Sequence, residues 1–176
     1  MTCIVGVEHN GTVTIGGDSA AVDGDDMTVC RTPKVFTVGE FLIGYCESFR
    51  MGQLVQYRLK VPDQRCDDPL EHLATVFVDR LRELLHKGGV AKTSADEENQ
   101  PGALLVGYRG RLYSVESDYA VIPSAHNYAA LGCGSAYALG SLATSTGSPA
   151  DRVTAALTAA AKHSTGVTGP FTILAN

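Results

Sequence analysis

The order in which strand and helix signals follow one another is the feature of this sequence that most limits its fold. Strand signals come in runs and helix signals come in pairs: strands, two helices, more strands, two further helices and a last strand. A doubly wound sheet needs strands and helices to alternate one by one, because each helix carries the chain across to the next parallel strand. The order therefore predicts an α+β chain in which two antiparallel sheets stack and helices cover both outer faces, a four-layer α/β/β/α sandwich.

Turn residues support the antiparallel strands. Asn10-Gly11 separates two runs rich in β-branched residues, and this dipeptide favours the positive φ angles of a two-residue hairpin. Gly39-Glu40 and Arg109-Gly110 separate further pairs of apolar runs in the same way. The predicted strands cover residues 3–8, 12–16, 35–38, 41–45, 103–108, 111–116, 119–122, 127–131 and 169–174.

Four helices are predicted from apolar residues at helical spacing and from capping residues. The second begins at Asp68, which caps it, with Pro69 in the first helical position, and the fourth follows a Ser148 cap. The predicted helices cover residues 48–59, 68–87, 135–144 and 150–163. Residues 88–102 are polar, with many small and acidic side chains, so we expect an exposed loop there.

Size and charge exclude several classes of protein. A chain of 176 residues has the size of one compact domain, which we take as residues 1–176. The net charge is −5 and the lysines and arginines are scattered, which argues against a nucleic acid or an anionic membrane as partner. The first apolar run has no basic residue before it and is interrupted at Glu8, so we predict neither a signal peptide nor a membrane anchor.

The cysteines do not form a recognisable framework. There are five of them, widely spaced and without a CxxC pair, so the sequence predicts neither a disulfide scaffold nor a zinc site. The histidines also lack ligand spacing, and we expect no metal and no cofactor. This cysteine usage is typical of a reducing compartment and favours the cytoplasm. The five are Cys3, Cys30, Cys46, Cys66 and Cys133.

Thr2 is the residue with the clearest chemical potential. Removal of Met1 would leave an amine and a hydroxyl on one residue, and an α-amine, with a reference pKa of roughly 7.7 to 8.0, can take the proton of that hydroxyl. Such a site also needs a cation to favour the alkoxide and an anion to hold the cation. Asp18 lies sixteen residues after Thr2, and Lys34 sixteen residues further. Taken singly, Asp18 could be a turn-capping aspartate and Lys34 a solvated lysine at a strand end.

Three motifs taken together resemble a known family. Thr2-Cys3-Ile4-Val5-Gly6-Val7, Gly16-Gly17-Asp18-Ser19 and Lys34-Val35 are similar to the motifs of the proteasome β-type and HslV-like N-terminal nucleophile hydrolases. The resemblance spans the chain and implies that fold. It implies that Thr2 is nucleophile and base, that Lys34 lowers the pKa of Thr2, and that Asp18 orients Lys34. Cleavage of peptide bonds would then pass through an acyl ester.

The same resemblance assigns further positions. Backbone N–H groups around Glu47, where the family usually has glycine, would meet the oxyanion. Cys133 stands where the family has a helping serine, unless Ser135 takes over with a shifted register. Thr165 matches a helping hydroxyl, and Lys162 replaces the usual aspartate near the N-terminus. The residues that would border the substrate pocket are Ala21, Thr32, Phe36 and Gly44.

Partners and two rival functions follow from this resemblance. It implies threonine endopeptidase subunits that assemble with copies of themselves into a ring or barrel, degrade unfolded polypeptides and work with an ATPase unfoldase. The first rival is a non-catalytic subunit with a structural role in assembly, because a retained Met1 would block the Thr2 amine. The second is an N-terminal hydrolase of small amides, which would need a closed pocket around Thr2. For the peptidase we expect Lys34→Ala to abolish turnover with little loss of folding.

Overall fold

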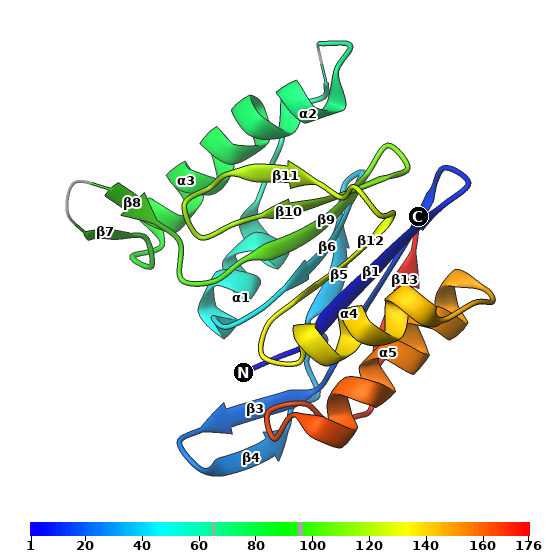
Figure 1. Cartoon of the computed structure of the whole chain (residues 1–176). Helices are drawn as coiled ribbons and strands as arrows, with labels where there is room; N and C mark the ends of the chain where they lie inside the picture. The colour runs from blue at the N-terminus through cyan, green and yellow to red at the C-terminus, as the bar shows by residue number, and fades with distance from the viewer. Residues whose placement is uncertain (65, 95–96) are drawn as a thin grey trace.

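Two antiparallel sheets form the centre of the computed structural model, which describes residues 1–64, 66–94 and 97–176 (Figure 1). The first sheet has the order β12-β1-β2-β13 and the second β11-β10-β9-β6-β5. The first comprises β1 (Ile4–His9), β2 (Thr12–Gly17), β12 (Tyr128–Leu131) and β13 (Thr172–Ala175). The second comprises β5 (Val35–Val38), β6 (Phe41–Tyr45), β9 (Leu104–Tyr108), β10 (Arg111–Val115) and β11 (Val121–Pro123). The predicted mixture of helices with antiparallel sheets is confirmed.

Capping residues begin the helices where the sequence predicts. The side chains of Ser48, Asp68 and Ser148 each accept a hydrogen bond from a backbone N–H in the first turn. The second predicted helix is interrupted by one π-helical turn, Leu73–Phe77. The helices are α1 (Phe49–Arg58), α2 (Pro69–His72), α3 (Val78–Lys87), α4 (Ser135–Thr144) and α5 (Pro149–His163). Among the described helices, none combines the length and the apolar character that a membrane span requires.

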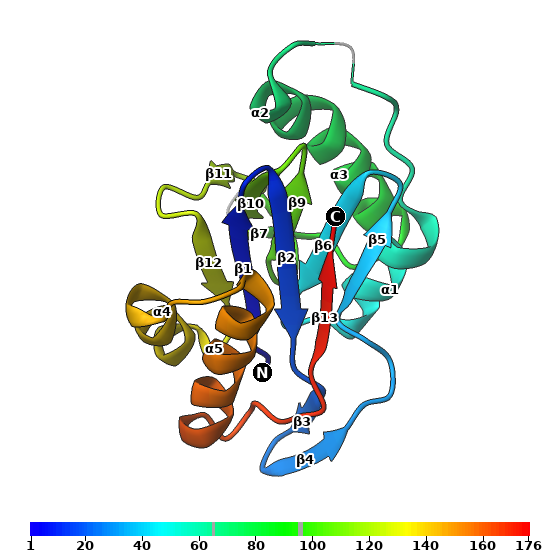
Figure 2. The ribbon, with the colours of Figure 1, turned by 90° about the vertical axis from the view of Figure 1, so that its right-hand side faces the viewer.

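Alternation along the strands divides the core into three apolar clusters. In β1, Ile4 packs between the two sheets, whereas Val5 on the opposite face packs against α4 and α5. In β6, Leu42 packs between the sheets and Ile43 packs against the cluster that includes α1 and α3. Figure 1 shows α3 on one side of the sheets and α4 and α5 on the other, and Figure 2 shows β13 beside β2. Both central strands are therefore buried on two faces.

Two short hairpins were missed by the sequence analysis. β3 (Ala20–Asp23) and β4 (Asp26–Val29) form a two-stranded ribbon that projects near the N-terminus (Figures 1 and 2). Within 88–102, which was predicted as an exposed loop, β7 (Lys92–Ser94) pairs with β8 (Glu97–Asn99), and Gln100 is buried. These strands carry many polar residues, so they lack the apolar alternation that sequence patterns detect.

One predicted strand starts later than expected because of its backbone. The strand was predicted over 119–122, but β11 begins at Val121. Tyr119 has a φ of 68°, a left-handed conformation that does not fit a strand. The ring of Tyr119 is buried, and it packs in the cluster beneath α1 and α3.

His72 makes the stability of this fold depend on pH. Its ring is 1 % exposed, stacks on Phe41 and Tyr108, and within the described part of the chain neither ring nitrogen has a hydrogen-bond partner. Burial lowers the pKa of His72 below its usual value. The unfolded chain then binds more protons than the folded one in acid, so stability is lost as the pH falls below about 6.5.

We expect His72→Phe, which keeps the stacking and removes the titrating group, to reduce this acid loss. The difference in unfolding free energy between pH 7 and pH 5 should shrink relative to the unmodified protein, by at most about 2 kcal/mol, the limit that an unfolded-state pKa of about 6.5 sets. Chemical denaturation at the two pH values measures it. His86→Phe, at an exposed position on α3, is the matched control and should leave the difference unchanged. An equal pH dependence in His72→Phe would contradict the assignment.

Candidate active site

Strand ends of both sheets bring the three predicted catalytic residues together. Thr2 lies just before β1 and Asp18 just after β2, and because Ile4 pairs with Gly17, the two residues lie at the same end of the first sheet. Lys34 directly precedes β5 of the second sheet. The cluster therefore forms where the ends of the two stacked sheets meet.

Lys34 has all three of its ammonium protons engaged. Its Nζ lies 3.1 Å from Thr2 Oγ1, 2.9 Å from Asp18 Oδ1 and 2.6 Å from the carbonyl oxygen of Ala20. Thr2, Asp18 and Lys34 are 3 %, 2 % and 1 % exposed. A buried ammonium group with three acceptors is held in one position, with its charge directed at the Thr2 hydroxyl.

Asp18 connects the cluster to the backbone on both sides. Its Oδ1 accepts a hydrogen bond from the backbone N–H of Cys3 at 2.9 Å, in addition to the one from Lys34. Its Oδ2 accepts from the N–H of Ala20 at 2.8 Å. Three donors thus fix the carboxylate between the start of the chain and the start of β3. Asp18 is thus placed to position the Lys34 ammonium, the role that the resemblance implies.

The Thr2 nitrogen contacts a thiol. Its N–H donates to Cys133 Sγ at 3.3 Å, and the thiol in turn lies 3.4 Å from the Thr2 carbonyl oxygen. Ser164 Oγ donates to the same sulfur at 3.4 Å. The Thr2 hydroxyl donates to the Met1 carbonyl at 2.5 Å. The structure thus brings Cys133 into the cluster and adds Ser164, which the sequence analysis missed.

Glycine geometry places the Cys133 loop against Thr2. Gly132 has a φ of 88°, and a Cβ there would overlap the Thr2 carbonyl. The N–H of Gly134 donates to the same carbonyl at 3.4 Å. Gly132-Cys133-Gly134, which separates β12 from α4, therefore contacts the N-terminus through its backbone.

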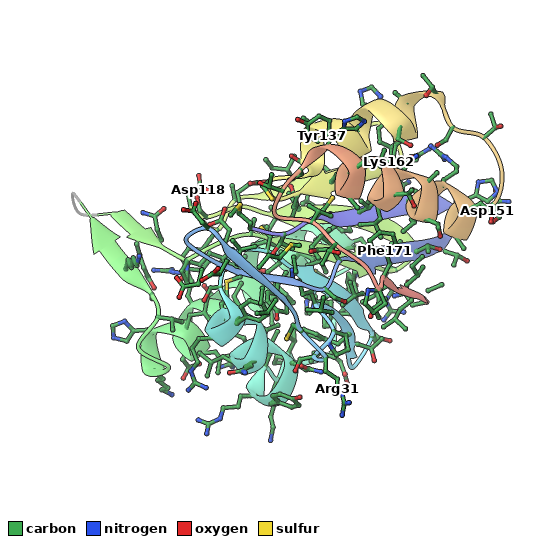
Figure 3. All side chains as sticks on the ribbon, turned by 90° about the horizontal axis from the view of Figure 1, so that it is seen from below. Arg31, Asp118, Tyr137, Asp151, Lys162 and Phe171 are labelled. Carbon is green, nitrogen blue, oxygen red and sulfur yellow. The ribbon has the colours of Figure 1, made fainter. Side chains whose placement is uncertain are left out.

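Three neighbouring positions named from the resemblance lie outside this cluster. Thr165 is exposed, and its hydroxyl bonds to none of the described residues, whereas Ser164, one position earlier, contacts Cys133 Sγ. The side chain of Ser135 makes no hydrogen bond to the cluster within the described chain, whereas Cys133 contacts the Thr2 nitrogen. Lys162 is exposed on α5, in the helical layer with Tyr137 (Figure 3).

The backbone of Glu47 has a conformation that is typical of glycine. Its φ is 73°, a left-handed conformation that glycine adopts easily and glutamate rarely. The residue is exposed, and no carbonyl of the described chain accepts a hydrogen bond from its N–H. This N–H is therefore available as a donor at the position where the resemblance expects oxyanion binding.

The residues expected around a substrate pocket lie at different depths. Ala21 in β3 and Thr32 in the segment before Lys34 are half-buried. Phe36 packs in the cluster beneath α1, with its ring 6.1 Å from that of Tyr45. Gly44 faces the core between the sheets, where a Cβ would meet Ile4 Cγ2 at 2.5 Å. Phe36 and Gly44, which the resemblance places at the border of a pocket, are therefore both buried in this structure.

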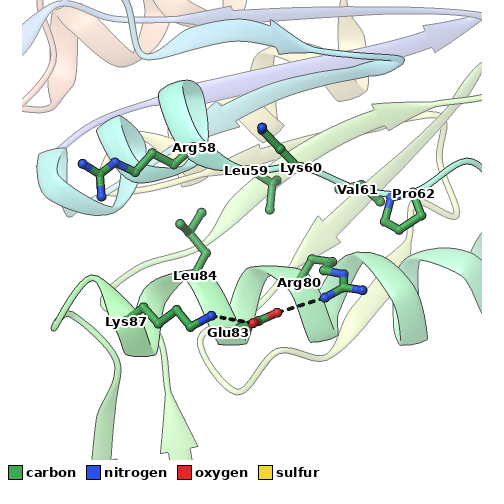
Figure 4. Close-up of a pocket in the computed structure, with 9 residues that line it drawn as sticks. All are labelled: Arg58, Leu59, Lys60, Val61, Pro62, Arg80, Glu83, Leu84 and Lys87. Atoms are coloured by element: carbon green, nitrogen blue, oxygen red, sulfur yellow. Dashed lines mark hydrogen bonds and ion pairs between the residues drawn. The ribbon is translucent and has the colours of Figure 1, made fainter.

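A separate groove of about 510 Å³ lies between the end of α1 and α3 (Figure 4). Its rim carries Arg58, Lys60, Arg80 and Lys87, and Glu83 bridges the last two. The groove shares no residue with the Thr2 cluster. The chemistry of the chain is therefore sought at the sheet ends and not in this groove.

Comparison with known proteins identifies the fold. No protein-family model and no curated protein sequence matches the chain. Among solved structures, it is similar to Thiobacillus denitrificans BPH in complex with epoxomicin, with 18 % identity and a TM-score of 0.83 over 99 % of this chain and 98 % of that chain. Thiobacillus denitrificans BPH on its own gives the same identity and TM-score, over 99 % and 97 %. Eukaryotic HslV from Trypanosoma brucei is 16 % identical, with a TM-score of 0.69 over 99 % and 98 %. The chain has the fold of these proteins.

Proposed function

We propose that this chain is a proteasome-type threonine peptidase subunit, in which Thr2 hydrolyses peptide bonds of unfolded polypeptides inside a ring or barrel of identical subunits. The observation that carries the proposal is the buried contact of the Thr2 hydroxyl with the Lys34 ammonium, itself held by Asp18. A hydroxyl at 3.1 Å from a fixed buried cation is suited to become an alkoxide.

The reaction would begin once Met1 is removed. The freed amine of Thr2 takes the proton from Oγ1, while the charge of Lys34 stabilises the developing alkoxide. Oγ1 attacks the peptide carbonyl, and the N–H of Glu47 donates to the resulting oxyanion; one such donor lowers the barrier by ~3 kcal/mol. The amine of the cleaved peptide leaves with a proton, and water then hydrolyses the ester on Thr2.

The remaining parts of the proposal concern the assembly. We take residues 1–176 as one domain, in which the three apolar clusters support the α/β/β/α order of layers. The ring of identical subunits, an ATPase unfoldase as partner and a cytoplasmic location extend the likeness to HslV and rest on it. Ala21, Thr32 and the exposed Glu47 are the positions that remain to border the substrate.

A second candidate function is a non-catalytic subunit that retains the fold for assembly. The position of Met1 favours it: the Met1 carbonyl accepts the proton of the Thr2 hydroxyl, and the Met1 side chain packs where a Cβ of Gly166 would lie. While Met1 stays in place, the Thr2 nitrogen is an amide and has no basic lone pair.

Intact mass followed by covalent labelling separates the two functions. We expect the purified chain to lack Met1 and to react with one epoxyketone per subunit, with the adduct on Thr2 and none formed by Thr2→Ala. A correctly processed chain that stays unlabelled would favour the structural subunit. Size in solution provides the third measurement, and a monomer would exclude the chamber.

Paired substitutions test which hydroxyl supports the Thr2 amine. Ser164→Ala removes the donor to Cys133 Sγ and is expected to lower turnover by about tenfold, since it loosens the group that contacts the amine. Thr165→Ala, at the next position, is expected to have a much smaller effect. Steady-state hydrolysis of a fluorogenic peptide measures both. A larger loss in Thr165→Ala would restore the role that the resemblance assigns to that residue.

A further inference from the structure

Cys133 combines exposure with contact to the reacting residue. It is exposed, unlike the other four cysteines, all of which the structure describes. Its sulfur nevertheless lies 3.3 Å from the Thr2 nitrogen, 3.4 Å from the Thr2 carbonyl oxygen and 3.4 Å from Ser164 Oγ. A small solute can therefore reach a thiol that touches the nitrogen which the proposed reaction uses as its base.

The two buried thiols near this end of the sheets are protected. Cys3 and Cys46 are buried, and burial raises the pKa of Cys3 to about 12 and that of Cys46 to about 11. Since the thiolate is the form that reacts, both are inert near neutral pH. An oxidant that enters the site will therefore meet Cys133 first.

We propose that Cys133 is a peroxide-sensitive modification site, at which oxidation joins the sulfur of Cys133 to the nitrogen of Thr2 and reversibly blocks the N-terminus. The inference rests on the proposed function for its effect on activity, because it is the free amine of Thr2 that the bond would occupy. The bond itself requires only the geometry of the two atoms.

The chemistry proceeds in two steps. Hydrogen peroxide oxidises the thiol to a sulfenic acid: its O–O bond breaks, one oxygen joins the sulfur and the other leaves as water. The lone pair of the Thr2 nitrogen then attacks the sulfur, the S–O bond breaks, and the departing hydroxide takes a proton from the nitrogen to form water. Sulfenic acids are known to condense with nitrogen in this way, giving a sulfenamide.

Reduction reverses the block. A small-molecule thiol attacks the sulfur of Cys133, the S–N bond breaks, and the Thr2 nitrogen takes up the thiol proton. A second thiol resolves the mixed disulfide, which leaves Cys133 reduced and the small thiols joined to each other. The amine of Thr2 is then free again.

Local geometry favours the Thr2 nitrogen over the sulfur of another cysteine as the atom that bonds to Cys133 Sγ. Gly132 and Gly134 hold the loop against the Thr2 carbonyl, so the sulfur and the nitrogen stay in contact. The Ser164 hydroxyl donates to the sulfur and keeps it turned toward this contact. A disulfide with Cys3 would instead need that buried thiol to ionise, which its pKa of about 12 opposes.

Mass spectrometry on the processed chain tests the bond without relying on activity. The chain is produced as a fusion cleaved directly before Thr2, treated with stoichiometric hydrogen peroxide and digested. We expect a species that joins the peptide starting at Thr2 to the peptide containing Cys133, two hydrogens lighter than their sum and separated by dithiothreitol. The variant with Cys3→Ala and Cys30→Ser, whose first tryptic peptide has no thiol, should still form it.

Controls and a second readout keep the two proposals apart. Cys133→Ser should form no linked species, and Cys66→Ser, at a half-buried site near α2, should form it as before. A disulfide to another cysteine, or a sulfenic acid trapped by dimedone without linkage, overturns the inference. Peroxide is expected to abolish peptide hydrolysis and dithiothreitol to restore it. A chain that forms the link but never hydrolyses peptides refutes the proposed function and leaves this site standing.

Discussion

Lys34→Met is expected to lower the free energy of unfolding by about 3–5 kcal/mol and to abolish peptide hydrolysis. The substitution removes the cation that faces Asp18, so that a fully buried carboxylate is left without its charge partner. It also removes the charge that lies 3.1 Å from the Thr2 hydroxyl. Chemical denaturation and steady-state turnover of a fluorogenic peptide measure the two effects.

Lys60→Met provides the matched control. Lys60 is exposed on the rim of the groove between α1 and α3, and its loss should change stability by no more than about 0.5 kcal/mol. If Lys34→Met were as stable as this control, the ion pair with Asp18 would not hold the sheet ends together. If it kept its turnover, Lys34 would have no part in the reaction.

Thr2→Ala is expected to reduce peptide hydrolysis by about 10⁴-fold or more, because no other hydroxyl lies against the Lys34 ammonium in the described chain. Stability should fall by only about 1–2 kcal/mol, since one of three acceptors of Lys34 is lost and water can replace it. Turnover and thermal unfolding measure the two quantities.

Two further variants sharpen this test. Thr2→Ser keeps a hydroxyl and an amine on one residue and should retain measurable activity. Thr12→Ala, at an exposed position in β2, should leave turnover at the level of the unmodified protein. Hydrolysis that survives in Thr2→Ala would show that another group is the nucleophile, and the proposed function would then have to be abandoned.

Much of this fold could be predicted because its signals are local. Asn10-Gly11 predicts the hairpin of β1 and β2, and Ser48, Asp68 and Ser148 predict where helices begin. These features depend on neighbouring residues, so a single sequence carries them. The hairpins β3–β4 and β7–β8 lack apolar alternation and could not be found in this way.

The candidate active site was also predicted in part, but from residue spacing and a family resemblance and not from local structural signals. The spacing of Thr2, Asp18 and Lys34, with the family resemblance, placed three residues together that the structure also brings together. Whether the hydroxyl of Ser164 or that of Thr165 contacts Cys133 depends on the backbone direction just after the end of α5. No local sequence pattern predicts that direction. The depth of Lys34 was also missed, and its burial leads us to expect a larger loss of stability on its removal than the sequence alone suggested.

The Lys34 cluster unites residues from both sheets, and this has an evolutionary consequence. Selection for stability alone would retain Lys34 and Asp18 even in proteins of this fold that have no catalytic activity. The reason is that the ion pair between the two residues joins the first sheet to the second. Positions that serve chemistry without serving the fold would diverge first. The exposed residues Glu47 and Cys133 are positions of that second kind, and comparison of orthologues at these two sites would test for a change of role.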